Sequence, residues 1–166
     1  MPIQAENLSE ASSERATIEI VNIRLFDASA TRIFEAFSDP AQLAKWWGPA
    51  GFTNTIHEFD FRPGGAWRLT MHGPNGADFE NESQIVEFEK PKRIVFEHLR
   101  PFHWYRMAMT FRPIGERTEL KWVMNLEATP DSENLKNFIE QANEQNFDRL
   151  AAHLADQPNP TSSRKT

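Results

Sequence analysis

The chain has 166 residues, of which 39% are apolar, and thirteen Phe and five Trp are among them. A domain of this length buries about 70% of its unfolded surface, which is enough for a core without covalent cross-links. The absence of cysteine excludes disulfides and thiolate metal sites, and a net charge of −6 argues against a nucleic-acid partner.

The chain begins with a polar stretch, 1–16, that lacks apolar periodicity and is expected to be a flexible tail. Alternating apolar residues then predict a strand over 17–26, and a first helix follows over about 30–37. A second short helix is expected to begin at Asp39-Pro40, because aspartate caps free amide groups and proline at the first helical position loses no hydrogen bond. Its apolar face holds Leu43, Trp46 and Trp47.

Six strand-like runs separated by turn residues come next, over 52–61, 66–72, 78–89, 93–99, 104–112 and 118–127. Their short connections indicate an antiparallel meander. Asn75-Gly76 predicts a two-residue hairpin, because both residues tolerate positive φ. A run over 131–155 without Gly or Pro predicts one long helix, and 156–166 is expected to be a second flexible tail. The expected fold class is α+β, with a curved antiparallel sheet of six to seven strands wrapped on the C-terminal helix.

A sheet of this size curls, and one helix does not fill its concavity, so we expect a ligand cavity between the sheet and the long helix. Strand and helix periodicity select the side chains that face this cavity. For each of them, an ordinary packed core is the alternative interpretation. The apolar candidates are Trp46, Trp67, Leu69, Met71, Phe96, Tyr105, Met107, Met109, Trp122, Met124, Phe138 and Ala142.

Three polar residues also fall on phases that look inward. Glu82 shares a phase with Phe88, and a carboxylate in an apolar cavity must be paired or protonated. Glu82 and His98 are therefore the catalytic candidates as well as candidate ligand contacts. Glu82 reaching solvent or an arginine, and His98 as a satisfied core imidazole, are the alternatives. Asn146 on the long helix either orients a ligand or bonds a backbone carbonyl.

The sequence contains no motif for a metal site, a phosphate-binding loop or a nucleophilic serine. The five histidines form no HxH or HExxH pair, so no metal site is expected. No phosphate-binding glycine loop and no GxSxG elbow occur, and no cofactor is expected. No run reaches the roughly 20 apolar residues that cross a bilayer, and the polar start is unlike a signal peptide. We therefore expect a cytoplasmic protein with no membrane insertion.

The chain resembles the activator-of-Hsp90-ATPase homologue branch of the START-like (SRPBCC) superfamily in four segments: FDASATRIFEAFSDPAQLAKWWGPAGF, FDFRPGGAWRLTMHGPNG, NESQIVEFEKPKRIVFEH and NFDRLAAHLA. The resemblance spans about 17–155. It implies a ligand-binding domain with the helix-grip, Bet v-like fold, in which an antiparallel sheet grips a long C-terminal helix around a deep hydrophobic cavity.

The leading functional interpretation is the binding of a small hydrophobic molecule in this cavity, without an assigned enzymatic activity. A cyclase, dehydratase or hydrolase that uses Glu82 and His98 as acid and base is one alternative. A chaperone-linked interaction module is the other. The eukaryotic cochaperone of this branch has an additional amino-terminal domain, whereas sixteen polar residues precede the first strand here, so a chaperone partner is not expected. A homodimer formed through an exposed strand edge stays open.

Overall fold

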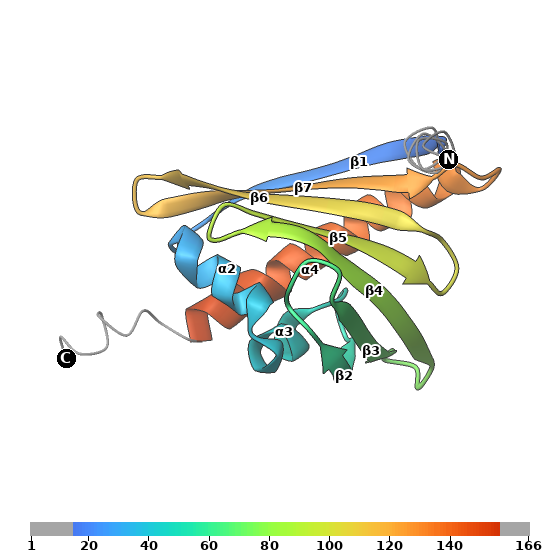
Figure 1. The fold of residues 1–166 in the computed structure, drawn as a ribbon, viewed down its shortest axis with the longest axis horizontal. Helices are drawn as coiled ribbons and strands as arrows, with labels where there is room; N and C mark the ends of the chain where they lie inside the picture. Colours follow the sequence, from blue (N-terminus) through green and yellow to red (C-terminus); the bar gives the residue numbers. More distant parts are fainter. Residues whose placement is uncertain (1–14, 157–166) are drawn as a thin grey trace, which may run out of the picture.

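A computed structural model describes residues 15–156, and the two predicted flexible tails lie almost entirely outside this range. The described part forms one seven-stranded sheet, two short helices after the first strand and a long C-terminal helix (Figure 1). All neighbouring strands are antiparallel, in the order β1-β7-β6-β5-β4-β3-β2. This is the helix-grip fold, so the predicted fold class is confirmed.

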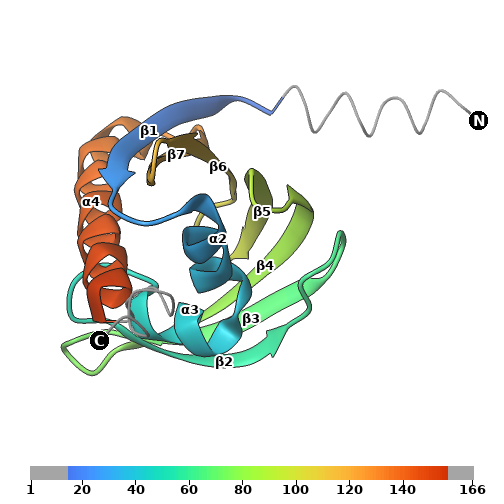
Figure 2. The same ribbon diagram turned by 90° about the vertical axis from the view of Figure 1, so that its left-hand side faces the viewer.

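The elements follow the predicted order along the chain. They are β1 (Thr17–Phe26), α2 (Ala30–Ser38), α3 (Pro40–Trp46), β2 (Thr53–Phe59), β3 (Ala66–His72), β4 (Asp78–Glu89), β5 (Arg93–Arg100), β6 (Tyr105–Ile114), β7 (Arg117–Glu127) and α4 (Ser132–Asp156). The sheet curves around α2, and α4 runs along its open side (Figure 2). This curvature creates the interior in which a site can form.

The two short helices begin where the sequence provides caps. The Ser29 hydroxyl accepts a hydrogen bond from the Arg32 amide at 3.2 Å, which starts α2. The Asp39 carboxylate accepts from the Ala41 amide at 3.1 Å, and Pro40 occupies the first position of α3. These caps place two consecutive tryptophans at the end of α3, where they enter the interior.

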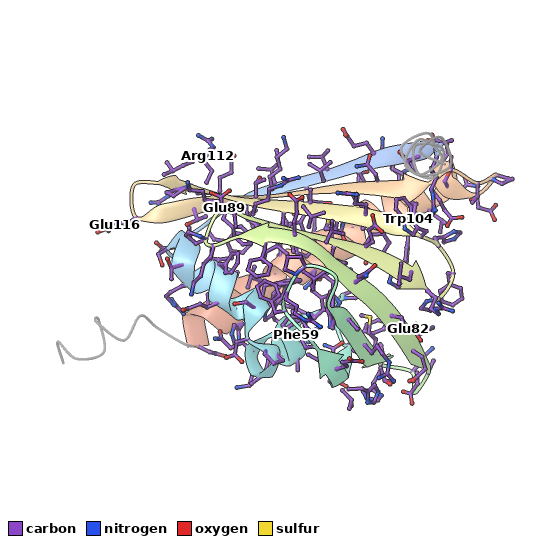
Figure 3. All side chains as sticks on the ribbon, viewed as in Figure 1. Phe59, Glu82, Glu89, Trp104, Arg112 and Glu116 are labelled. Carbon is purple, nitrogen blue, oxygen red and sulfur yellow. The ribbon has the colours of Figure 1, made fainter. Side chains whose placement is uncertain are left out.

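Aromatic rings fill most of the space between the sheet and the helices. Phe37 of α2 lies among five other rings, with centroid distances from 5.5 Å to Trp67 up to 6.5 Å to Phe59. Figure 3 shows these side chains crowded between the sheet, α2 and α3, with Phe59 labelled at their edge. The interior is therefore a densely packed aromatic core rather than a wide hollow.

The turn between β3 and β4 differs from the predicted two-residue hairpin. The Gly73 amide donates to the Ala77 carbonyl at 2.7 Å, and the Gly76 amide donates to the Gly73 carbonyl at 3.1 Å. Three residues therefore form the loop, and Gly76 closes it with a φ of +90°. A turn followed by a left-handed residue is the usual three-residue hairpin, and Asn75-Gly76 fits this turn as well as the shorter one.

Candidate functional site

A pocket lies between the inner face of β3 to β6 and the middle of α4. Its volume is about 120 Å³. Pockets for drug-sized ligands measure roughly 300–1,000 Å³, so the deep cavity that the sequence led us to expect is largely occupied by protein side chains. The segment Trp47–Pro49, which follows α3, forms one wall, and Trp67 and Phe96 contribute further aromatic surface.

Four pocket residues form one continuous row across the sheet. Trp67 on β3 pairs with Ser83 on β4, Ser83 pairs with His98 on β5, and His98 pairs with Tyr105 on β6. Directly paired residues on the same face have Cβ atoms about 4.5–5.5 Å apart. The row therefore presents an indole, a hydroxyl, an imidazole and a phenol side by side to the pocket.

His98 is held in a defined tautomer. Its Nε2 lies 3.0 Å from the Pro101 carbonyl oxygen, which only accepts, so Nε2 carries the hydrogen. The ring stacks on Tyr105 with centroids 4.8 Å apart and an interplanar angle of 16°. Burial lowers the pKa of His98, and the charge of His103 acts in the same direction. The imidazole is therefore neutral at pH 7, and its Nδ1 is a hydrogen-bond acceptor.

The other three members of the row also have unused hydrogen-bonding groups. Ser83 is only 5% exposed, and its hydroxyl makes no hydrogen bond with any residue between 15 and 156. The buried Trp67 Nε1 has no acceptor within the same range. Burial raises the pKa of Tyr105, so its phenol keeps the proton. Within 15–156, Trp67 Nε1 is the atom of the row that is fully enclosed without a partner, and Trp122 Nε1 in the core is enclosed in the same way. A buried donor is rarely left unsatisfied in proteins.

The wall opposite the row is fastened to α4 by two side chains. The Asn146 amide accepts from the Gly48 amide at 3.2 Å and donates to the Trp46 carbonyl at 2.9 Å. The Arg149 guanidinium donates to the carbonyl oxygens of Trp47 and Gly48 at 2.7 and 3.1 Å, and to those of two further residues, Pro49 and Lys45. Burial lowers the pKa of Arg149. Both side chains therefore fix the shape of the pocket.

The structure brings together eight of the side chains that the sequence proposed for ligand contact, and these line the pocket: Trp67, Leu69, Met71, Phe96, His98, Tyr105, Ala142 and Asn146. Five others are buried in the core outside the pocket: Trp46, Met107, Met109, Trp122 and Met124. Phe138 is 70% exposed, because the buried stripe of α4 runs through Ile139, Asn143 and Asn146 and leaves Phe138 on its flank.

Glu82 does not face the pocket, in contrast to the expectation. Its side chain is 44% exposed, and its Oε2 lies 3.1 Å from Arg100 Nε (Figure 3). The reason is a register shift between Ile85 and Glu87, which reverses the inward phase of β4. Counting alternate residues backwards from Phe88 does not allow for this bulge, and it therefore placed Glu82 on the inner face incorrectly. The proposed acid–base pair of Glu82 and His98 loses its geometric basis, because only His98 lines the pocket.

Several pocket residues were not proposed from the sequence: Trp47, Gly48, Pro49, Asn81, Ser83 and Asn143. Trp47 turns into extended backbone directly after α3, with φ −68° and ψ 136°. Gly48 has a φ of +99°, and a Cβ there would lie 2.8 Å from Met71 Cε. The Gly48-Pro49 pair after a helix is a recognisable break that indicates such a turn. Ser83 carried no signal, because its phase depends on the bulge.

Two further hollows lie between other elements. One, of about 390 Å³, lies beside α3 and β2, and the other, of about 220 Å³, lies between the end of β1 and the end of α4. Two of their charged lining side chains are in ion pairs, Glu58 with Arg68 and Arg24 with Glu144 and Asp148, and Asp27 is a third charged residue of the lining. Within 15–156 the structure contains no cluster of three potential metal ligands and no helix long and apolar enough to span a membrane.

The fold and the sequence both have known relatives. The crystal structure of a Chromobacterium violaceum protein is 27% identical, with a TM-score of 0.74, and the match covers 86% of this chain and 99% of the other. A solution structure from Arthrobacter aurescens has a TM-score of 0.77 at 20% identity, covering 85% and 91% of the two chains. The Silicibacter pomeroyi protein described as AHSA1 has a TM-score of 0.69 at 21% identity, covering 85% and 100%.

No curated protein matches the chain. The family described as "Activator of Hsp90 ATPase homolog 1-like protein" matches residues 27–155, which include every element from α2 to the last turn of α4. This range contains the whole lining of the pocket. The resemblance seen in the sequence is thereby confirmed, and the chain belongs to the Activator of Hsp90 ATPase homolog 1-like family.

Proposed function

We propose that this domain binds a small, uncharged and largely apolar molecule in the pocket between β3 to β6 and α4. The observation that carries the proposal is a pocket with four aromatic side chains in its lining, Trp47, Trp67, Phe96 and Tyr105, in which Trp67 Nε1 has no acceptor among the described residues. An unpaired buried donor costs about 1–3 kcal/mol, which a ligand with an acceptor recovers on binding.

The size of the pocket limits the ligand to about one ring. An engineered apolar cavity of about 150 Å³ accepts benzene, and this pocket measures about 120 Å³. Larger apolar molecules require displacement of the segment Trp47–Pro49, which Arg149 and Asn146 hold in place. The ligand we propose is therefore smaller than the hydrophobic molecules for which a deep cavity was expected.

The charge of the lining supports an uncharged ligand. None of the described lining residues is Asp, Glu, Lys or Arg, and His98 is neutral because burial lowers its pKa. An ionised ligand would lose its hydration without gaining a counter-ion, which is strongly unfavourable in an apolar site. Arg149 approaches from α4, but its guanidinium hydrogens are donated to main-chain carbonyls.

A filling substitution tests the site. In Ala142→Leu, a larger side chain enters the pocket from α4 without loss of helix propensity. Ala152→Leu makes the same change at an exposed position ten residues further along the same helix and is the matched control. The ¹⁵N-labelled full chain is titrated with toluene, and the indole N–H signals are followed by NMR, with Trp67→Phe identifying the Trp67 signal.

We expect saturable shifts of the Trp67 indole signal in the wild type and in Ala152→Leu, with millimolar affinity, and a loss of these shifts in Ala142→Leu. Binding that survives Ala142→Leu unchanged, or shifts absent from the wild type, would contradict the proposal. Native mass spectrometry of the freshly purified chain then searches for a retained molecule of the size of one ring.

A further inference from the structure

The row that faces the pocket contains one acceptor and one donor on directly paired residues. Ser83 and His98 are cross-strand partners on β4 and β5, and both are buried, at 5% and 7% exposure. His98 Nδ1 offers a lone pair, because Nε2 holds its hydrogen against the Pro101 carbonyl. The Ser83 hydroxyl offers a hydrogen and has no acceptor among residues 15–156. Cross-strand partners on one face have Cβ atoms about 4.5–5.5 Å apart, so a ligand atom between the two side chains is within reach of both.

Few functional groups satisfy this pair. A ligand hydroxyl donates to His98 Nδ1 and accepts from Ser83 Oγ, so both buried groups are paired at once. A carbonyl or ether oxygen only accepts and leaves the Nδ1 lone pair without a donor. A carboxylate also only accepts, and it brings a charge into a lining that holds no described cation. The hydroxyl is therefore the group that fits the pair best.

The aromatic part of the lining favours a flat ring for the same ligand, while Asn81, Asn143 and Asn146 form polar parts of the remaining wall. Trp47, Trp67 and Phe96 surround the pocket, and the Trp47 and Trp67 ring centroids lie 5.1 Å apart. Ring faces and edges of this kind stack favourably on another aromatic ring. The volume of about 120 Å³ accommodates a single six-membered ring with one small substituent.

We propose that the pocket selects a phenol-class molecule, one aromatic ring with one hydroxyl group, through a hydrogen bond donated to His98 Nδ1 and one accepted from Ser83 Oγ. This inference rests on the proposed function, since it identifies the chemical class of the ligand at the same site. Trp67 and Tyr105, the outer members of the row, border the same hydroxyl position on either side.

Three probes of nearly equal size test the selection: phenol, toluene and benzoate, each titrated into the full chain with the Trp67 indole signal as the readout. We expect phenol to bind about tenfold more tightly than toluene, because its hydroxyl makes two neutral hydrogen bonds that toluene cannot make. Benzoate is expected to produce no saturable shift below the concentration at which toluene saturates the site.

Substitutions locate the selection within the row. In Ser83→Ala and in His98→Phe we expect the phenol-to-toluene preference to fall to about twofold or less, while toluene affinity stays within about threefold of the wild type. Glu82→Gln is the matched control, because Glu82 neighbours Ser83 but pairs with Arg100 outside the pocket, and it should keep the full preference. A circular dichroism melt establishes that each variant is folded.

The outcomes separate the two proposals. Equal binding of phenol and toluene, or tighter binding of benzoate, would overturn the phenol-class inference and leave the proposed function standing. A phenol preference that persists in both Ser83→Ala and His98→Phe would also overturn it. Absence of any shift with toluene and phenol would overturn the proposed function, and the inference with it.

Discussion

The interior has two halves that differ in their packing, one around α2 and one around the middle of α4, although the same sheet covers both. Around α2, Phe37 packs against aromatic rings from α3, β2, β3 and β5, and two of these rings, Trp67 and Phe96, also line the pocket. Around the middle of α4, the row from Trp67 to Tyr105 keeps polar groups and a residual pocket. The binding site that we propose lies in the α4 half.

The largest expected effect is in the packed half. Phe37→Ala removes a ring that is only 2% exposed and has five aromatic neighbours. We expect the free energy of unfolding to fall by about 3–5 kcal/mol, because a cavity replaces the ring. Urea denaturation measures this change. A loss below about 1 kcal/mol would mean that the α2 half is no better packed than the pocket half.

The segment Trp47–Pro49, the pocket wall opposite the row, should be the next most sensitive. Arg149→Ala removes the donor of the Gly48 carbonyl and one of the two donors of the Trp47 and Pro49 carbonyls, which keep Asn54 Nδ2 and the Phe52 amide, and we expect a loss of about 1–3 kcal/mol in the free energy of unfolding. Arg149→Lys keeps a charge but not the planar fork and should recover only part of the loss. Full recovery by lysine would show that charge, rather than geometry, holds the segment.

The smallest expected effect is the pH dependence of folding stability, which depends on two buried histidines. Burial lowers the pKa of His98 in the pocket half and of His153 near the end of α4, where Lys45 and Arg32 act in the same direction. The unfolded state therefore binds more protons than the folded state below the ordinary histidine pKa of about 6.5. The stability that the two neutral histidines contribute is therefore fully present above that pH and is lost as the pH falls below it.

Each histidine contributes at most about 1.4 kcal/mol per pH unit within that window. His98→Phe removes one of the two groups, so the decrease in melting temperature between pH 7 and pH 5 should become smaller in this variant. Thermal melts across this range measure the change. If the decrease in melting temperature between pH 7 and pH 5 were the same in His98→Phe as in the wild type, His98 would titrate alike in the folded and unfolded states. Its assignment as a neutral acceptor would then fail.

The architecture was predictable from the sequence, since it depends on local signals. Alternating apolar residues defined every strand, and Asp39-Pro40 identified the start of α3, which the structure places at Pro40. The interior was less predictable. A β-bulge between Ile85 and Glu87 has no clear sequence signal, yet it decides that Ser83 rather than Glu82 faces the pocket.

Cavity size is a second property that periodicity does not give. The phase of Met107 and Trp122 correctly indicated the inner face, but their burial in the core depends on how rings from four elements pack together. Phe138 shows the same limit on a helix, because a shift of one residue position around the helix is enough to move a side chain from the buried stripe to an exposed flank. The pocket of about 120 Å³ is what remains after this packing.

The most direct test of the pocket is the position of a bound probe. Intermolecular nuclear Overhauser effects between toluene and the ¹³C-labelled chain should connect the ring protons to the methyl groups of Leu69 and Ala142, which line the pocket from β3 and α4. Contacts with Ile56 beside α3 instead, or with none of these methyl groups, would place the probe outside the pocket and contradict the account.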